Sequence, residues 1–182
     1  MLKKILYWFH NKALKEALSK TQHAHKTVSL ETAKTICILF NAEDPANETV
    51  IKKLMTQLQQ QGFKIEVMGY ISKLPKNRGR VIFNYFSRKE VSWYLVPANN
   101  IVENFANTPF DILLNLYTEE ILPLEYISAI AKSTFRIGRY IEGKDYYCDM
   151  MISLKEKDAL ETLIQQIIHY LNQINTTTTS HA

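Results

Sequence analysis

Residues 36–53, ICILFNAEDPANETVIKK, decide the fold that we expect for this chain. They run from a continuous apolar stretch through a short polar turn into the start of an amphipathic helix. An apolar run of this length, bounded by a turn, is typical of a strand that is buried on both faces. A buried strand that leads directly into a helix is the unit from which parallel α/β sheets are built.

The same alternation of strand and helix extends over the rest of the chain. Short apolar runs predict further strands at 63–71, 81–86, 110–117, 135–140 and 148–152. Apolar stripes at steps of three and four predict helices at 50–58, 122–131 and 160–174, with a short helix around 102–106. We therefore predict a three-layer α/β fold with a mostly parallel open sheet of five or six strands, Rossmann-like or flavodoxin-like. For 148–152, an antiparallel edge strand is the alternative.

The polar turn at 41–45 admits two interpretations. Asp44 can cap the following helix while Pro45 takes its first position, where a missing N–H costs nothing. Alternatively, Glu43 and Asp44 act as acids or hold a cation at the carboxyl edge of the strand, where open α/β sheets bind ligands. We favour the cap. The turn has no glycine and carries two negative charges, so it does not suit phosphate, and the chain contains neither a P-loop nor a dinucleotide fingerprint.

The N-terminal residues predict a separate basic amphipathic helix. Residues 1–26 contain six lysines and one glutamate, whereas the rest of the chain has 16 basic and 17 acidic residues. The apolar face of this helix must be covered by the α/β body, a second copy of the protein or an anionic membrane surface, and we favour the first two. The candidate residues for partner or membrane contact are Lys3, Lys4, Trp8, Phe9, Lys12 and Lys15.

The expected organisation is a helix at 1–20, a linker at 21–33, one α/β domain at 34–175 and a disordered tail at 176–182. The chain has 182 residues, of which 46% are hydrophobic, and this is enough for one domain with a substantial core. No apolar run approaches the ~20 residues of a membrane span, and lysines interrupt the N-terminal apolar positions. We expect a cytoplasmic protein that could associate peripherally with a membrane, with Cys37 and Cys148 as structural thiols.

Polar residues also follow two later strands of the predicted sheet. Because the carboxyl ends of parallel strands meet at one edge, we expect these residues to lie near the turn at 41–45. Arginine and tyrosine there could orient an anionic or sugar-like ligand. The candidate ligand-binding residues are Glu43, Asp44, Asn115, Glu119, Arg139, Tyr140, Asp145 and Tyr146. The alternative, which we favour, is that Asp145 pairs with Arg139 and the tyrosines pack over the sheet edge.

Signatures of the familiar catalytic and metal-binding classes do not occur in the sequence. The five histidines form no HxxxH or HExxH pattern, and there is no G-x-S-x-G elbow. His23 and His25 in the linker have no third ligand nearby, so we expect no metal and no cofactor. Segment 87–93 (SRKEVSW) predicts a solvated turn anchored by Trp93, and an anion site at Arg88 and Lys89 is the alternative.

We therefore expect a non-catalytic binding or interaction module with a small-ligand site at the carboxyl edge of the sheet. Two alternatives stay open. One is a small hydrolase or transferase that uses Glu43, Asp44, Glu119, Asp145 or Asp149. The other is a peripheral membrane adaptor that binds through its N-terminal helix. Because the α/β body has no excess of basic residues, we expect no specific nucleic-acid partner.

Five segments carry a resemblance that covers nearly the whole chain: MLKKILYWF (1–9), ILFNAEDP (38–45), PFDILLNL (109–116), FRIGRY (135–140) and DYYCDMMISLKEKDALETLIQQIIHYLNQI (145–174). They are similar to a small family of bacterial proteins described only as a domain of unknown function. This resemblance implies an α/β domain with a basic N-terminal helix and supplies no activity, cofactor or catalytic residue. Segment 110–138 is also similar, more weakly, to a strand–helix–strand unit in the N-terminal domain of heptosyltransferase-like glycosyltransferases. The chain has no counterpart to the nucleotide-sugar-binding domain of those enzymes, so this similarity concerns the fold alone.

Overall fold

Six parallel strands form the central sheet of the computed structural model, which describes residues 2–21, 26–73, 82–98, 100–155 and 159–174. The strands are β1 (Thr35–Asn41), β2 (Lys64–Ile71), β3 (Asn84–Ser87), β4 (Phe110–Leu116), β5 (Ser133–Arg139) and β6 (Met150–Ile152). Their order across the sheet is β3-β2-β1-β4-β5-β6, and every neighbouring pair is parallel. This is the Rossmann order and not the flavodoxin order. The predicted three-layer α/β fold is therefore confirmed, and of the two predicted topologies the Rossmann topology is the one observed.

For the edge strand β6, the sequence left a parallel and an antiparallel strand as alternatives. Strand β6 pairs in parallel with β5, in the register Ile137↔Met150 and Arg139↔Ile152, and is not antiparallel. A parallel edge strand needs a crossover, which residues 140–149 supply through loops and a short 3₁₀ turn at Asp145–Tyr147. The predicted tail at 176–182 and the histidines at 23 and 25 lie outside the described residues.

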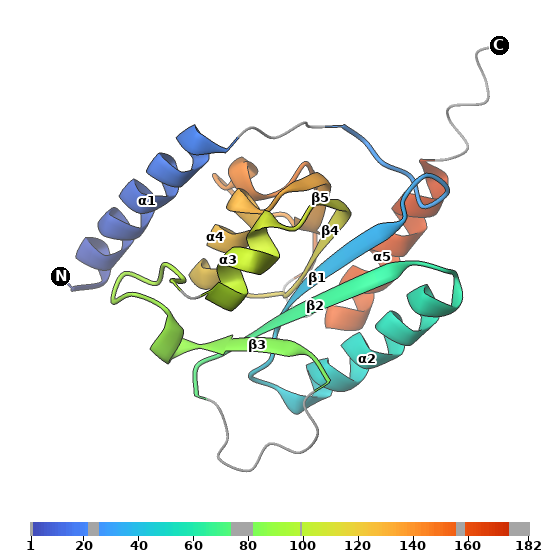
Figure 1. The fold of residues 1–182 in the computed structure, drawn as a ribbon, viewed down its shortest axis with the longest axis horizontal. Coiled ribbons are helices and arrows are strands. Elements are labelled where there is room, and N and C mark those ends of the chain that lie inside the picture. The colour runs from blue at the N-terminus through green and yellow to red at the C-terminus, as the bar shows by residue number, and fades with distance from the viewer. Residues whose placement is uncertain (1, 22–25, 74–81, 99, 156–158, 175–182) are drawn as a thin grey trace.

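Helices cover both faces of the sheet (Figure 1). The helices in the described part of the chain are α1 (Leu2–Lys20), α2 (Pro45–Gln60), α3 (Asn100–Asn107), α4 (Leu122–Ile130) and α5 (Leu160–Gln173). Helices α2 and α5 pack on one face of the sheet, and α3 and α4 pack on the other. The sheet therefore divides the interior into two apolar cores, which is the three-layer arrangement that the sequence predicted.

Successive residues of β1 alternate between these two cores. Ile36, Ile38 and Phe40 belong to the core beneath α2 and α5, whereas Cys37 and Leu39 belong to the core beneath α3 and α4. Cys37 and Cys148 are free and buried, and burial raises the pKa of both thiols. They pack as small apolar side chains, as predicted.

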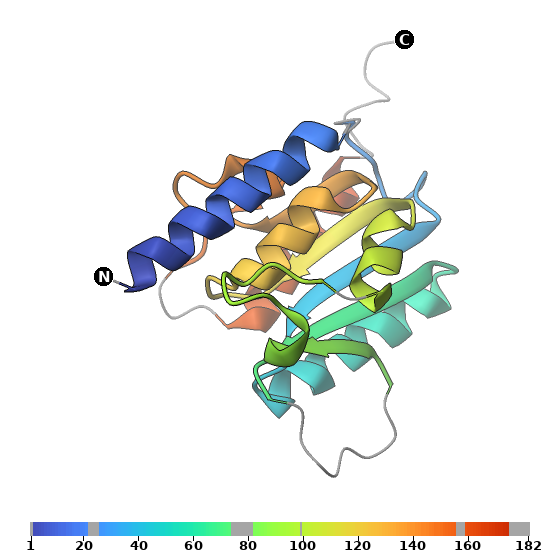
Figure 2. The same ribbon diagram turned by 60° about the vertical axis from the view of Figure 1, so that its left-hand side comes forward.

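Helix α1 lies outside the sandwich, against α4 (Figure 2). Its contacting stripe recurs at steps of four and contains His10 and Leu14, which are 0% and 3% exposed, with Leu18 half-buried. The structure leaves Leu2, Ile5 and Phe9, which are also apolar residues of this helix, 86%, 46% and 38% exposed. Because one helix can present only one stripe to α4, the apolar residues of α1 are divided between an inner and an outer face.

Candidate functional site

The strand order reverses between β1 and β4, at the centre of the sheet. The chain leaves β1 toward α2 on one face and leaves β4 toward α4 on the other face. The two connections separate at the carboxyl ends of these strands and leave a crevice between them. In open α/β sheets, ligands bind at this topological switch point.

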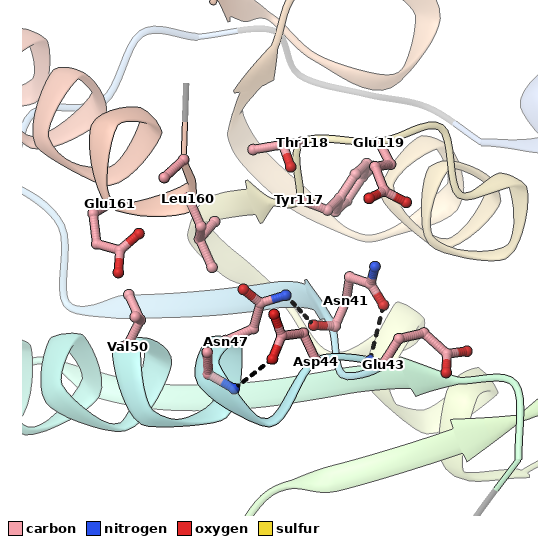
Figure 3. Close-up of a pocket in the computed structure, with 12 residues that line it drawn as sticks. Asn41, Glu43, Asp44, Asn47, Val50, Tyr117, Thr118, Glu119, Leu160 and Glu161 are labelled. Carbon is pink, nitrogen blue, oxygen red and sulfur yellow. Dashed lines mark hydrogen bonds between the residues drawn. The ribbon is translucent and has the colours of Figure 1, made fainter. Parts of the chain in front are cut away.

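A cavity of about 400 Å³ occupies this position. We call it the switch-point crevice. Asn41, Asp44 and Asn47, at the end of β1 and the start of α2, lie opposite Tyr117, Thr118 and Glu119, which follow β4 (Figure 3). Leu160 and Glu161, at the start of α5, line a third side. The crevice is therefore built from three chain segments that the parallel topology brings to one edge.

The turn after β1 is held by its own polar side chains. Asp44 Oδ1 accepts a hydrogen bond of 2.8 Å from the Ala46 N–H, so Asp44 is the N-cap of α2 and the favoured interpretation of this turn is confirmed. Asn41 Oδ1 accepts from the Glu43 N–H at 3.0 Å, and the Asn47 amide donates to the Asn41 carbonyl oxygen at 3.0 Å. These bonds fix the wall of the crevice before any ligand enters.

The lining of the crevice is acidic. Its carboxylates are Glu43, Asp44, Glu119 and Glu161, and no lysine or arginine occurs among its described lining residues. The helices α2 and α5 begin here, and their positive ends are already complemented by Asp44 and Glu161. The crevice therefore favours a cation or a neutral group that can donate hydrogen bonds, and it disfavours phosphate.

A second hollow, of about 330 Å³, lies beside the switch-point crevice. Lys3, Leu6 and Tyr7 of α1 form one wall of this α1 hollow, and Asn41, Glu43 and Glu119 line both cavities. Glu43 also accepts a hydrogen bond from the Ser72 N–H, which ties the end of β2 to the same place. The docked N-terminal helix is thus part of the surface that surrounds the candidate site.

An ionic network borders this hollow, whose lining includes Tyr7 and Glu120. Lys144 donates to Glu120 and, at 2.6 Å, to Glu125 Oε2, and the Tyr7 hydroxyl donates to Glu120. Partial burial raises the pKa of Glu120, but hydrogen bonds from Lys144 and Tyr7 outweigh it and hold that pKa below its ordinary value. The same hydrogen bond raises the pKa of Tyr7 to about 12. Glu125 is fully buried, and burial raises its pKa against the opposing effect of Lys144.

The candidate residues from the sequence lie in three different places. Glu43, Asp44 and Glu119 line the switch-point crevice, as the expected edge arrangement requires. Asn115 is fully buried and donates to Ser128 Oγ at 2.8 Å and to Cys148 Sγ at 3.2 Å, so its amide is occupied within the core. The remaining candidates line neither cavity: Arg139 ends β5, and the others lie in the β5–β6 connection, namely Tyr140, Asp145 and Tyr146.

Asp149 is one of the carboxylates that a hydrolase or transferase would use under the enzyme alternative. In the structure it forms a structural ion pair. Its carboxylate accepts from Arg136 Nη2 at 2.9 Å and from the Arg136 backbone N–H at 2.8 Å. Arg136 is 1% exposed and also donates to the Tyr146 carbonyl oxygen. This pair attaches the β5–β6 connection to the sheet. The planar guanidinium of arginine suits such a bidentate pair with a carboxylate.

The sequence interpretation missed several residues that the structure brings to this edge. Asn47 and Glu161 line the switch-point crevice, and Lys144 links the β5–β6 connection to Glu120 and Glu125. Glu161 lies in the first turn of α5, and helix starts meet the carboxyl edge of a parallel sheet, so its position was accessible to inference. Nothing in the local pattern around Lys144 identifies its partners, which are 19 or more residues away.

In the described part of the chain, no group of three or more histidine, cysteine, aspartate or glutamate side chains is arranged to hold a metal ion. None of the helices in this part combines the length and the apolar character that crossing a membrane requires.

The fold and the crevice define an α/β protein of Rossmann topology with an acidic switch-point cavity. The chain belongs to a family of unknown function, DUF6913, whose family model matches residues 7–174. No curated protein and no solved structure matches the chain. The comparisons therefore confirm the resemblance to a family of unknown function and add nothing to the weaker similarity to heptosyltransferases, although 110–138 does form the strand–helix–strand unit β4-α4-β5.

Proposed function

We propose that this protein is a non-catalytic binding module whose switch-point crevice takes a small polar ligand, either positively charged or rich in hydroxyl groups. The observation that carries this proposal is the position of an acidic cavity of about 400 Å³ at the reversal of strand order. A cavity of this size can enclose a metabolite-sized molecule.

The lining narrows the class of ligand. Carboxylates accept hydrogen bonds and attract ammonium groups, so a diamine, a polyamine or an amino sugar suits Glu119 and Glu161. Amide and hydroxyl groups from Asn47 and Thr118 add neutral hydrogen-bonding positions of the kind that sugars use. A nucleotide or a sugar phosphate would bring negative charge against four carboxylates.

A thermal-shift screen tests the proposal with four groups of compounds: polyamines, unmodified sugars and amino sugars, nucleotides, and phosphorylated metabolites. We expect stabilisation by members of the first two groups only. For any amine that binds, Glu119→Ala and Glu161→Ala should each weaken affinity by about tenfold, because a hydrogen bond to a charged group contributes about 1.5–3 kcal/mol. Glu103→Ala is the matched control, since Glu103 is also an exposed glutamate in a helix first turn but lies outside both cavities.

The alternatives predict different results in the same experiment. Stabilisation confined to nucleotides or phosphorylated compounds would contradict an acidic ligand site. If the protein chemically converts a bound sugar or amine, and Glu43→Gln and Glu119→Gln abolish this reaction, the protein is instead a hydrolase or transferase. We also place the protein in the cytoplasm, because buried free thiols such as Cys37 and Cys148 suit a reducing compartment.

A further inference from the structure

An apolar and aromatic patch covers the outer face of α1. Eight large hydrophobic residues are exposed in the described part of the chain, and five of them gather here. We call these five the outer patch: Leu2, Ile5, Trp8 and Phe9 of α1, with Trp93 from the segment after β3. The Phe9 ring is 4.8 Å from the Trp8 ring and 4.9 Å from the Trp93 ring, so two segments that are far apart in sequence form one surface.

The backbone that carries Trp93 is fixed in place. The Arg88 guanidinium donates to the carbonyl oxygens of Ser92 at 2.7 Å and Trp93 at 3.3 Å, so Arg88 serves its own loop and does not face an anion. Leu95 holds the left-handed conformation, with φ 64°, that closes this turn. The indole of Trp93 is nevertheless 54% exposed, so the predicted anchor instead points outward beside Phe9.

Lysines surround the outer patch. Lys4, Lys12 and Lys15 lie four residues before, four after and seven after Trp8, and therefore share its side of the helix. The Lys12 ammonium lies 5.6 Å from the Trp8 ring. Glu16 is the one acidic residue of α1, and its carboxylate is paired with Lys20 at 2.8 Å. The outer face of α1 is accordingly both apolar and positively charged.

We propose that the outer patch binds an anionic membrane surface, with α1 lying parallel to it while its inner face stays docked on α4. Aliphatic side chains and tryptophan beside lysine are the composition of helices that rest in the headgroup region. A second copy of the chain, related by two-fold symmetry, would bring Lys4, Lys12 and Lys15 against the same lysines, which opposes self-association. The proposal does not depend on a ligand in the switch-point crevice.

Trp8 and Trp93 are the two tryptophans of the whole chain, so intrinsic fluorescence reports directly on the outer patch. The experiment uses the full chain with vesicles of phosphatidylcholine alone and of equal parts phosphatidylcholine and phosphatidylglycerol. We expect co-sedimentation and a blue-shifted emission with the anionic vesicles only, weakened by high salt. Lys4→Glu/Lys12→Glu should lower affinity at least about tenfold, because each lysine near an anionic surface contributes severalfold to binding.

The control for charge is Lys52→Glu/Lys53→Glu on α2, which changes the net charge equally on the opposite side of the sheet and should keep affinity within about twofold. Trp8→Ala/Trp93→Ala keeps every lysine and should still lower affinity severalfold, because it removes both indoles of the outer patch. Both side chains are more than half exposed, so their loss should spare the fold. Three results would overturn the proposal: no binding to anionic vesicles, equal loss in the two charge variants, or concentration-dependent dimers that bury the tryptophans without vesicles.

Discussion

The fully buried carboxylate of Glu125 depends on one cation, Lys144, whose Nζ lies 2.6 Å from Glu125 Oε2. We predict that Lys144→Met destabilises the protein by roughly 3–5 kcal/mol at neutral pH, because it leaves a buried charge without its partner. Burial already raises the pKa of Glu125, so the folded state binds a proton more tightly than the unfolded state. The loss should therefore be smaller near pH 5 and larger near pH 8, because ionisation becomes more costly as the pH rises above about 4.3.

Urea unfolding at the two pH values measures this effect. Lys132→Met is the matched control, since Lys132 is exposed and its replacement should change the free energy of unfolding by less than about 0.5 kcal/mol. Lys144→Met combined with Glu125→Gln should recover much of the loss, because the buried group is then neutral. Equal effects of the two lysine variants would show that Glu125 does not need its ion pair.

At the scale of elements, the docking of α1 on α4 depends on a neutral histidine. His10 is 0% exposed, and its Nδ1 must carry the proton because it lies 3.0 Å from the Tyr94 carbonyl oxygen. Burial lowers its pKa, Lys144 adds to this, and the Tyr94 carbonyl and Glu120 oppose it. Protonation therefore favours the undocked helix, so docking should be complete above about pH 6.5 and weaken as the pH falls below that value.

Trypsin cleavage at the lysines of α1 measures docking across this range. Relative to the cleavage of an unstructured peptide by trypsin at the same pH, we expect faster cleavage near pH 5.5 than near pH 7.5, and a flatter profile in His10→Gln, which keeps a donor but does not titrate. His169→Gln is the control, because His169 is exposed on α5 and its loss should leave the profile unchanged. A profile that stays the same in His10→Gln would contradict the role of His10.

The same element shows how far the sequence could predict the structure. The period of three and four residues identified α1 correctly, and Asp44 with Pro45 identified the start of α2, because both signals are local. Which stripe of α1 faces inward depends on α4 and on the backbone of Tyr94, which are far along the chain. The parallel topology sufficed to predict that Glu43, Asp44 and Glu119 lie at one edge of the sheet, whereas the contacts of Asn115 and Asp149 required the tertiary structure.

At the scale of the whole molecule, the sheet and its four covering helices form the stable part, and α1 is attached to it from outside. Strands β1, β2 and β4 each contribute buried residues to both cores, whereas α1 contributes Leu14 alone to the buried part of the core beneath α3 and α4. The switch-point crevice belongs to the sheet, but one wall of the α1 hollow belongs to α1. Because α1 has few buried residues, we expect its release to cost less free energy than unfolding of the sheet.

This difference in attachment predicts unfolding in two steps. Both tryptophans lie in the outer patch, so fluorescence follows the release of α1, whereas far-ultraviolet circular dichroism is dominated by the remaining elements. In urea, the fluorescence midpoint should come at a lower concentration than the dichroism midpoint, and mild acid should widen the gap by protonating His10. A Tyr85→Trp reporter in β3, placed in a Trp8→Phe/Trp93→Phe background, should follow the dichroism instead. Coincident transitions from all three probes would show that α1 unfolds together with the sheet, and the helix would then have to be counted as part of the cooperative core.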